Sequence, residues 1–190
     1  PLAAIEEQLD AIFSDITPNV IKIGMLFNQE IVHLVAEFLS QHAQNIPIVL
    51  DPVMVAKSGD YLLLPEAIET LKRELIPQVT LITPNINEAQ ALSNMKIKTP
   101  SDMLKGAEII HTLGNVNVLL KGGHLDGISC DDLLFTSSAQ HWFKAPRIET
   151  INTHGTGCTL SAAIAANLAQ GQDLVSSCQN AKDYLYQAML

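Results

Sequence analysis

A glycine-rich turn at residues 151–160 carries residue types that suit the binding of an anion. Gly155 and Gly157 flank Thr156, and the turn runs directly into an alanine-rich segment at 161–168. The free backbone N–H groups at the start of a helix, together with the positive end of its dipole, attract anions. Glycine lets the main chain approach the anion and adopt a positive φ. The sequence therefore predicts an anion cradle formed by the backbone of 155–157.

Cys158 follows the second glycine and falls in the first turn of the predicted helix. A thiol at that place is expected to have a lowered pKa and to form thiolate readily. An anion cradle beside a proton acceptor is what phosphoryl transfer to a hydroxyl group needs. His154, next to the turn, is a candidate ligand contact. The alternative is a glycine turn that simply enters a buried helix, with Cys158 as a small apolar filler.

Further candidates lie where the predicted strands end, because open α/β sheets bind ligands beyond the carboxyl ends of their strands. These candidates are Gly24, Met25, Asp51, Thr83, Asn85, Glu88 and Lys121. A carboxylate pair, Asp51 and Glu88, suits Mg²⁺, which takes oxygen ligands. Lys121 suits a phosphate as a point charge. Each residue also has an ordinary alternative: Asp51 as a loop cap, Glu88 as a solvated helix acid and Lys121 as a surface lysine. The prediction of a binding site therefore depends on their joint placement at one edge of the sheet.

The elements that must position these residues alternate along the chain. Helices are predicted over 2–13, 30–42, 65–75, 87–92, 101–113, 157–170 and 174–189. Strands are predicted over 20–25, 46–50, 79–83 and 116–120, followed by a hairpin of 132–136 and 140–143. Ser101 is the expected cap of its helix, and Gly114 its end. Apolar strands followed by helices predict an α/β fold of three layers, a mostly parallel sheet with helices on both faces.

Composition narrows the class of protein. The 190 residues suit one domain with a sizeable core, and the net charge of −9 disfavours nonspecific binding to nucleic acid or anionic membranes. The three cysteines are widely spaced and form no C-x-x-C pair, so neither a zinc site nor a disulfide framework is expected. No signal-peptide pattern or 18-residue apolar run is seen. A cytoplasmic protein is the resulting expectation.

Two common phosphate motifs do not occur in the sequence. There is no G-x-x-x-x-G-K-[ST] loop, and the turn at 155–160 lacks the third glycine of a dinucleotide fingerprint. The histidines have no metal-ligand spacing. Four of them, His33, His42, His111 and His141, are interpreted as surface or packing residues, whereas His124 is left open.

Five segments together resemble one family of small-molecule kinases in the ribokinase superfamily. They are KIGML at 22–26, DPVMVAKSGD at 51–60, LITPNINEA at 81–89, VLLKGGH at 118–124 and NTHGTGCT at 152–159. Their identity and order are similar to those of the hydroxymethylpyrimidine/phosphomethylpyrimidine kinases of thiamine biosynthesis. The resemblance implies a ribokinase-like fold and ATP-dependent phosphorylation of 4-amino-5-hydroxymethyl-2-methylpyrimidine, then of its monophosphate to the diphosphate.

The resemblance also implies roles for particular residues. Cys158 stands where the wider superfamily has an aspartate base, and it would take the proton of the substrate hydroxymethyl group. The N–H groups of Gly155, Thr156 and Gly157 would hold the transferring phosphoryl group. The nucleotide and Mg²⁺ would lie against Lys121, Thr83, the Asn85/Glu88 pair and Asp51. Met25, Gly24 and His154 would contact the pyrimidine. A homodimer that binds Mg-ATP is expected.

The sequence departs from the family pattern at both ends, and two alternative functions remain open. The family begins with a strand and a glycine-rich segment that helps to hold the pyrimidine, and this chain starts after them. A segment beyond the last helix is also expected to be missing, so 1–190 is interpreted as one domain incomplete at both ends. A missing first strand would leave its neighbour's edge bare. A pyridoxal or pyridoxine kinase of the cysteine-containing type is the alternative enzyme. A catalytically idle binding module on the same fold is the alternative of another class.

Overall fold

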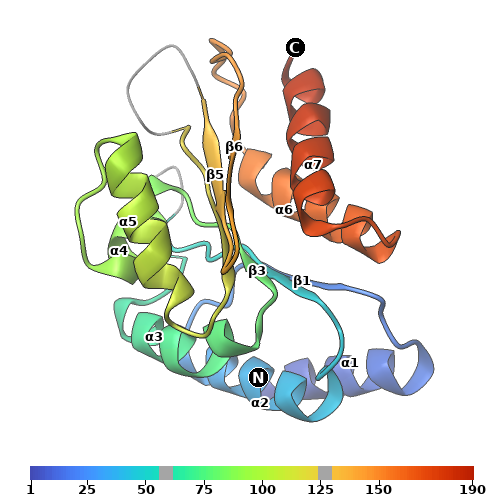
Figure 1. The fold of residues 1–190 in the computed structure, drawn as a ribbon. Helices are drawn as coiled ribbons and strands as arrows, with labels where there is room; N and C mark the ends of the chain where they lie inside the picture. The colour runs from blue at the N-terminus through green and yellow to red at the C-terminus, as the bar shows by residue number, and fades with distance from the viewer. Residues whose placement is uncertain (56–61, 124–129) are drawn as a thin grey trace.

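The computed structural model describes residues 1–55, 62–123 and 130–190. In these segments six strands form one sheet with the order β1-β2-β3-β4-β5-β6 (Figure 1). The strands are β1 (Ile21–Ile23), β2 (Ile48–Leu50), β3 (Leu81–Ile82), β4 (Asn117–Leu120), β5 (Asp132–Phe135) and β6 (Gln140–Phe143). The first four are parallel, and the last two add an antiparallel hairpin. The predicted mostly parallel sheet is confirmed.

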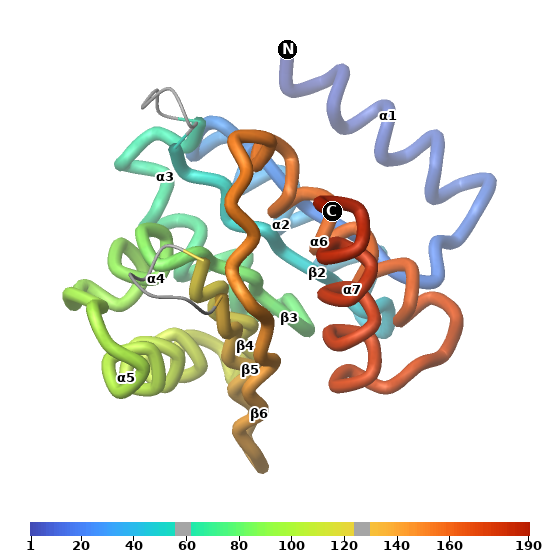
Figure 2. The backbone as a smooth tube through the Cα atoms, turned by 90° about the horizontal axis from the view of Figure 1, so that it is seen from above, coloured from blue at the N-terminus to red at the C-terminus, as the bar shows by residue number. Residues whose placement is uncertain are grey.

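Helices cover both faces of this sheet (Figure 2). The helices that precede or connect the parallel strands are α1 (Leu2–Asp15), α2 (Gln29–His42), α3 (Pro65–Thr70), α4 (Ile86–Ser93) and α5 (Pro100–His111). The helices α6 (Thr156–Ala169) and α7 (Leu174–Met189) follow the hairpin and lie together on the opposite side of the sheet. The result is the three-layer α/β arrangement that the sequence predicts.

The strands bury alternate side chains in two separate cores. In β2, Ile48 and Leu50 face the core shared with the connecting helices, whereas Val49 faces α6 and α7. Successive side chains of a strand point to opposite faces, and parallel strands that are covered on both sides are apolar throughout. All three of these β2 residues are almost fully buried. The strand ends are thereby held rigidly at the edge where the polar candidates lie.

Two helices differ in detail from the predictions, and one of them, α5, also ends at His111 rather than at Gly114. Helix α5 is capped by Thr99, not Ser101, because Pro100 occupies its first position, where the missing N–H costs nothing. Asp102 completes a capping box with Thr99. The predicted helix 65–75 is α-helical only to Thr70 and continues as a π-helical turn, η1 (Leu71–Leu75), and a 3₁₀ turn, η2 (Ile76–Gln78).

No helix in the described ranges is long and apolar enough to cross a membrane. The three cysteines, all of them within those ranges, are free thiols. His124 and residues 56–60 of the DPVMVAKSGD segment lie outside the described residues.

Candidate active site

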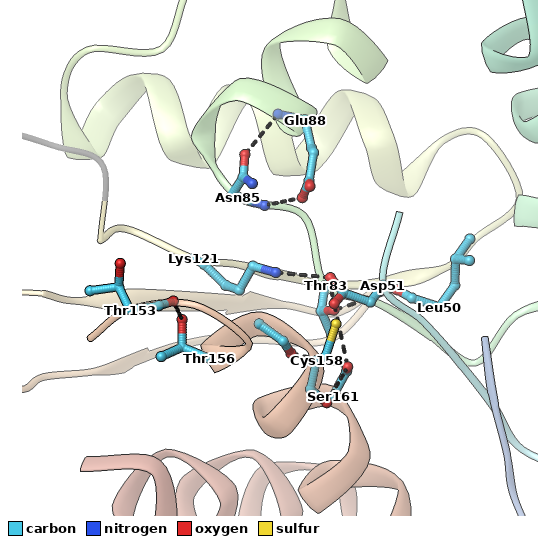
Figure 3. Close-up of polar contacts among 11 residues, drawn as sticks. Leu50, Asp51, Thr83, Asn85, Glu88, Lys121, Thr153, Thr156, Cys158 and Ser161 are labelled. Carbon is cyan, nitrogen blue, oxygen red and sulfur yellow. Dashed lines mark hydrogen bonds and ion pairs between the residues drawn. The ribbon is translucent and has the colours of Figure 1, made fainter. Parts of the chain in front are cut away.

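An ion pair joins the ends of β2 and β4. Lys121 Nζ lies 2.9 Å from Asp51 Oδ1, although the two residues are 70 positions apart in sequence (Figure 3). Parallel pairing brings them together: Asp51 N–H donates to the carbonyl of Ile23, and Lys121 N–H donates to that of Pro84. The prediction that Asp51 and Lys121 share one edge of the sheet is confirmed.

Asp51 is held from three directions. Besides Lys121, it accepts a hydrogen bond from Thr83 Oγ1 at 3.3 Å and a long one from Ser161 Oγ at 3.5 Å. Asp51 is 2 % exposed, while the Lys121 side chain keeps 15 % of its surface exposed. A buried carboxylate needs such partners, because desolvation of an unpaired charge is costly. Asp51 is therefore fixed, and the lysine that neutralises it retains access to the surface.

The glycine turn forms the start of α6, where the sequence predicts an anion cradle. Gly155 is the N-cap residue, with φ 80° and ψ −5°, a left-handed conformation that glycine adopts without strain. Thr159 N–H donates to the Gly155 carbonyl at 2.9 Å. The N–H groups of Gly155, Thr156, Gly157 and Cys158 precede the first intrahelical hydrogen bond, so the predicted cradle at 155–157 consists of backbone donors that have no partner within the helix.

Gly157 brings this first turn against the ion pair. A Cβ atom at Gly157 would lie 3.3 Å from Lys121 Nζ and 3.5 Å from Asp51 Oδ2, which is tighter than ordinary packing for the lysine. Ser161, one turn later on the same helix face, donates to the Gly157 carbonyl at 3.1 Å and also reaches Asp51. The predicted anion cradle, Lys121 and the buried Asp51 thus form one cluster. Sequence reasoning missed Ser161, although its spacing of four from Gly157 was the available signal.

Cys158 is the exposed thiol of the three. Figure 3 shows its sulfur directed from the start of α6 towards the Asp51 side of the cluster. Cys178 is buried and Cys130 half-buried, and burial raises the pKa of Cys178 to about 12 and also raises the pKa of Cys130. Accessibility therefore singles out Cys158, since thiolate reactivity needs both ionisation and access.

Glu88 and Asn85 form a capping box at the start of α4. Asn85 N–H donates to Glu88 Oε2 at 2.7 Å, and Glu88 N–H donates to Asn85 Oδ1 at 2.9 Å. Glu88 is 6 % exposed, and burial raises its pKa to about 7. The Asp51 charge raises that pKa further, whereas the Lys121 charge opposes the shift. The Glu88 charge therefore interacts with both members of the ion pair, and an added cation would favour its ionised form.

The predicted substrate residues lie at the margin of this cluster. Gly24 directly follows β1 and is half-buried, Met25 is 54 % exposed, and His154 is exposed directly before the glycine turn. The side chains of Met25 and His154 are therefore accessible to a ligand.

The four histidines assigned to surface or packing roles have them. His33 pairs with Glu74 on the surface, and His42 stacks on Phe38. His111 bonds the carbonyl of Val116, and His141 lies half-buried in β6.

A separate hollow of about 480 Å³ lies between α1 and α2, away from the Asp51–Lys121 pair. Its lining includes Glu7, Asp10, Phe13 and His42, and none of the predicted site residues is part of it.

Comparison with known proteins decides the family. A profile of the phosphomethylpyrimidine kinase family matches residues 1–190. The chain belongs to this family. It is 48 % identical over 187 residues to the hydroxymethylpyrimidine/phosphomethylpyrimidine kinase of Escherichia coli, covering 97 % of this chain and 70 % of that protein. It is 46 % identical over 189 residues to the thiamine biosynthesis bifunctional protein ThiED of Geobacter sulfurreducens, covering the whole of this chain but only 38 % of the longer protein.

Solved structures agree with the family and the fold. A phosphomethylpyrimidine kinase from Clostridium difficile matches with a TM-score of 0.87 and 39 % identity, over 100 % of this chain and 77 % of that one. A pyridoxal kinase from Bacillus subtilis, solved as an ADP complex, matches with a TM-score of 0.88 and 37 % identity, over 95 % and 68 %. Relatives and neighbours are small-molecule kinases, so the expected family, fold and enzyme class are confirmed.

Proposed function

We propose that this chain carries the phosphoryl-transfer machinery of a hydroxymethylpyrimidine/phosphomethylpyrimidine kinase of thiamine biosynthesis. In the first step ATP phosphorylates the hydroxymethyl group, and in the second it converts the monophosphate to the diphosphate. The observation that carries the proposal is the contact of the Gly157 turn with the Asp51–Lys121 pair. That contact places a cation beside the N–H groups of a helix start, as the charge that develops on a transferring phosphoryl group requires.

In the proposed first step, Cys158 accepts the proton of the substrate hydroxyl group. The hydroxyl oxygen then bonds to the γ-phosphorus of ATP, the bond to the ADP oxygen breaks, and ADP leaves with its electron pair. The N–H groups at the start of α6 hold the phosphoryl oxygens, and Lys121 contacts the nucleotide phosphates. Thr83 and Asn85 support this side of the site. Such a sparse set suffices because phosphoryl transfer depends mainly on positioning and charge stabilisation.

The residues of the site also fit Mg²⁺. The buried Glu88 carboxylate gains from a nearby cation, and Mg²⁺ commonly takes only one or two protein carboxylates beside phosphates and water. Glu88 would hold the ion, with Asp51 at its outer side because Lys121 already neutralises that carboxylate. When bound, the ion neutralises charge on the phosphate oxygens.

On the acceptor side, Met25 would pack on the pyrimidine ring, with Gly24 and His154 beside it. The relatives named for pyrimidine phosphorylation are 46–48 % identical, which supports this substrate. Pyridoxal is the second candidate, because the Bacillus subtilis neighbour is named for it.

Turnover of the full-length protein with Mg-ATP, offered both alcohols separately, tests the proposal. Higher kcat/KM for hydroxymethylpyrimidine supports it, whereas preference for pyridoxal would reverse the order of the two candidates. Transfer to neither alcohol would favour the idle binding module.

We further infer a cytoplasmic homodimer. The free cysteines suit a reducing compartment, and the family resemblance supports the dimer. Light scattering of the purified protein measures the oligomeric state.

A further inference from the structure

A second buried ion pair lies on the other side of the Lys121 segment from Asp51. It joins Asp132, the first residue of β5, to Lys182 of α7, with Nζ 2.5 Å from Oδ2. Both side chains are 9 % exposed. A buried ion pair seldom stabilises a protein more than apolar side chains of the same volume would. The polar contacts of this pair therefore call for an explanation other than stability.

The pair is connected to the chain directly after Lys121. Asp132 directs its second oxygen, Oδ1, to the N–H of Gly122 at 2.9 Å. Lys182 donates its second hydrogen bond to the carbonyl of Cys130 at 2.7 Å. One carboxylate thus bridges a backbone N–H next to the phosphate-contacting lysine and an ammonium group in α7.

The backbone at Gly122 has little freedom to adjust. A Cβ atom there would lie 1.9 Å from the carbonyl oxygen of Asp131, so only glycine allows the backbone at Gly122 to approach the Asp131 segment so closely. On the other side, Lys121 N–H bonds the Pro84 carbonyl at 2.8 Å. The backbone at residues 121 and 122 is consequently held between the Pro84 segment on one side and the start of β5 on the other. On the β5 side, the Asp132 carboxylate accepts the hydrogen bond.

We propose that Asp132 and Lys182 are positioning residues for the contact between Lys121 and the phosphates of ATP. Lys182 keeps the Asp132 carboxylate oriented, and that carboxylate holds Gly122 and hence the Lys121 backbone in place. The inference rests on the proposed kinase function. Both side chains are buried and linked to Gly122, so we assign them an effect that passes through the geometry of residues 121 and 122.

Two double variants separate positioning from simple stability. Asp132→Leu with Lys182→Met replaces the pair by apolar side chains and removes the acceptor for Gly122. Asp132→Asn with Lys182→Met also removes both charges, but the amide oxygen still accepts the Gly122 hydrogen bond. Leu134→Ala, in the buried part of β5, is the matched control that loosens the same strand without touching the polar link.

The measurements are the Kd of Mg-AMP-PCP by calorimetry, the kcat/KM for Mg-ATP, the KM for hydroxymethylpyrimidine, and the Tm. The Asp132→Leu pair should lower kcat/KM for Mg-ATP by roughly 10- to 100-fold, since small displacements of a positioned group have effects of this order. Its Kd for Mg-AMP-PCP should rise while the KM for the pyrimidine stays unchanged. The Asp132→Asn pair should restore nucleotide binding.

The inference is overturned if the Asp132→Leu pair binds Mg-AMP-PCP like the parent, or if Leu134→Ala weakens binding equally at a similar Tm. It is also overturned if the Asp132→Asn pair restores nothing. If the parent itself neither binds Mg-AMP-PCP nor transfers phosphate, the proposed function fails first, and the two failures remain distinguishable.

Discussion

Replacing Glu88 by glutamine removes a charge that burial disfavours while keeping the capping contact. The pKa of Glu88 is raised from an ordinary 4.5 to about 7, chiefly by burial. Because the folded-state pKa is the higher one, the folded protein binds the proton more tightly than the unfolded chain does. The stability that this proton confers is complete below pH 4.5 and is lost as the pH rises through 7. At about 1.4 kcal/mol for each pH unit between the two values, the loss is roughly 3 kcal/mol.

Glu88→Gln is neutral at every pH, and its amide oxygen can still accept the Asn85 N–H. The variant should therefore match the parent near pH 4.5 and exceed its free energy of unfolding by roughly 3 kcal/mol at pH 8. Denaturant unfolding at a series of pH values measures the difference between the two proteins. Titration of other groups is common to both proteins and cancels in this difference.

Asp102→Asn is the matched control, because Asp102 occupies the same position in the capping box of α5 but is only half-buried. The pKa of Asp102 is lowered, first by the hydrogen bond from the Thr99 side chain. The contribution of its carboxylate to stability is therefore present at neutral pH and is lost as the pH falls through the lowered pKa. The two variants should respond to pH with opposite signs. If the Glu88→Gln difference stays constant between pH 5 and pH 8, burial does not raise the pKa of Glu88 and the reasoning is refuted.

Three further predictions concern the cluster around the glycine turn. Cys158→Ala should slow the first phosphorylation by about 10²–10⁴-fold. The second phosphorylation should slow less, because the acceptor phosphate has a pKa near 6 and needs no base at neutral pH. The control variant Cys130→Ala should leave both rates unchanged. Steady-state assays with the alcohol and with its monophosphate separate the two rates, and equal losses would contradict the role of a base. Lys121→Met should cost about 3 kcal/mol by leaving the Asp51 charge buried without its partner, and added Asp51→Asn should restore denaturant stability but not ATP turnover; restored turnover would refute the phosphate contact. Gly157→Ala should raise the KM for Mg-ATP with little change in the Tm, because its methyl group would press on Lys121 at 3.3 Å. An unchanged KM would contradict this prediction and show that the turn can shift freely.

Local patterns predicted most of the fold because its elements have clear periodicity and ends. Helix α7 spans the predicted 174–189, with Asp173 as its cap. The cap of α5 was assigned wrongly because both Thr99 and Ser101 can cap a helix, and Pro100 between them decided the position. The π-helical turn at Leu71–Leu75 has the same apolar spacing as an α-helix, so periodicity alone does not distinguish it.

The candidate site was predictable to the extent that topology alone determines it. Parallel strands end at a common edge, which is why Asp51 and Lys121 could be placed together before their contact was known. Periodicity carries no information on which side chains pair across the sheet. The buried links from Ser161 to Asp51 and from Lys182 to Asp132 join residues 110 and 50 positions apart, and only the packed layers bring them together.

Asp51 shows how stability and the proposed phosphate binding would be coupled at this edge of the sheet. Its partners come from three elements: Thr83 follows β3, Lys121 follows β4, and Ser161 belongs to α6. The start of α6 carries the predicted anion cradle, and Lys121 supplies the cation at the end of β4. Because one buried carboxylate bonds to both, it fixes the distance between the two groups that are proposed to hold the same phosphate. The buried Asp51 charge is costly, but it holds Lys121 and the start of α6 in fixed positions relative to each other. The exposed part of Lys121 remains available to a ligand.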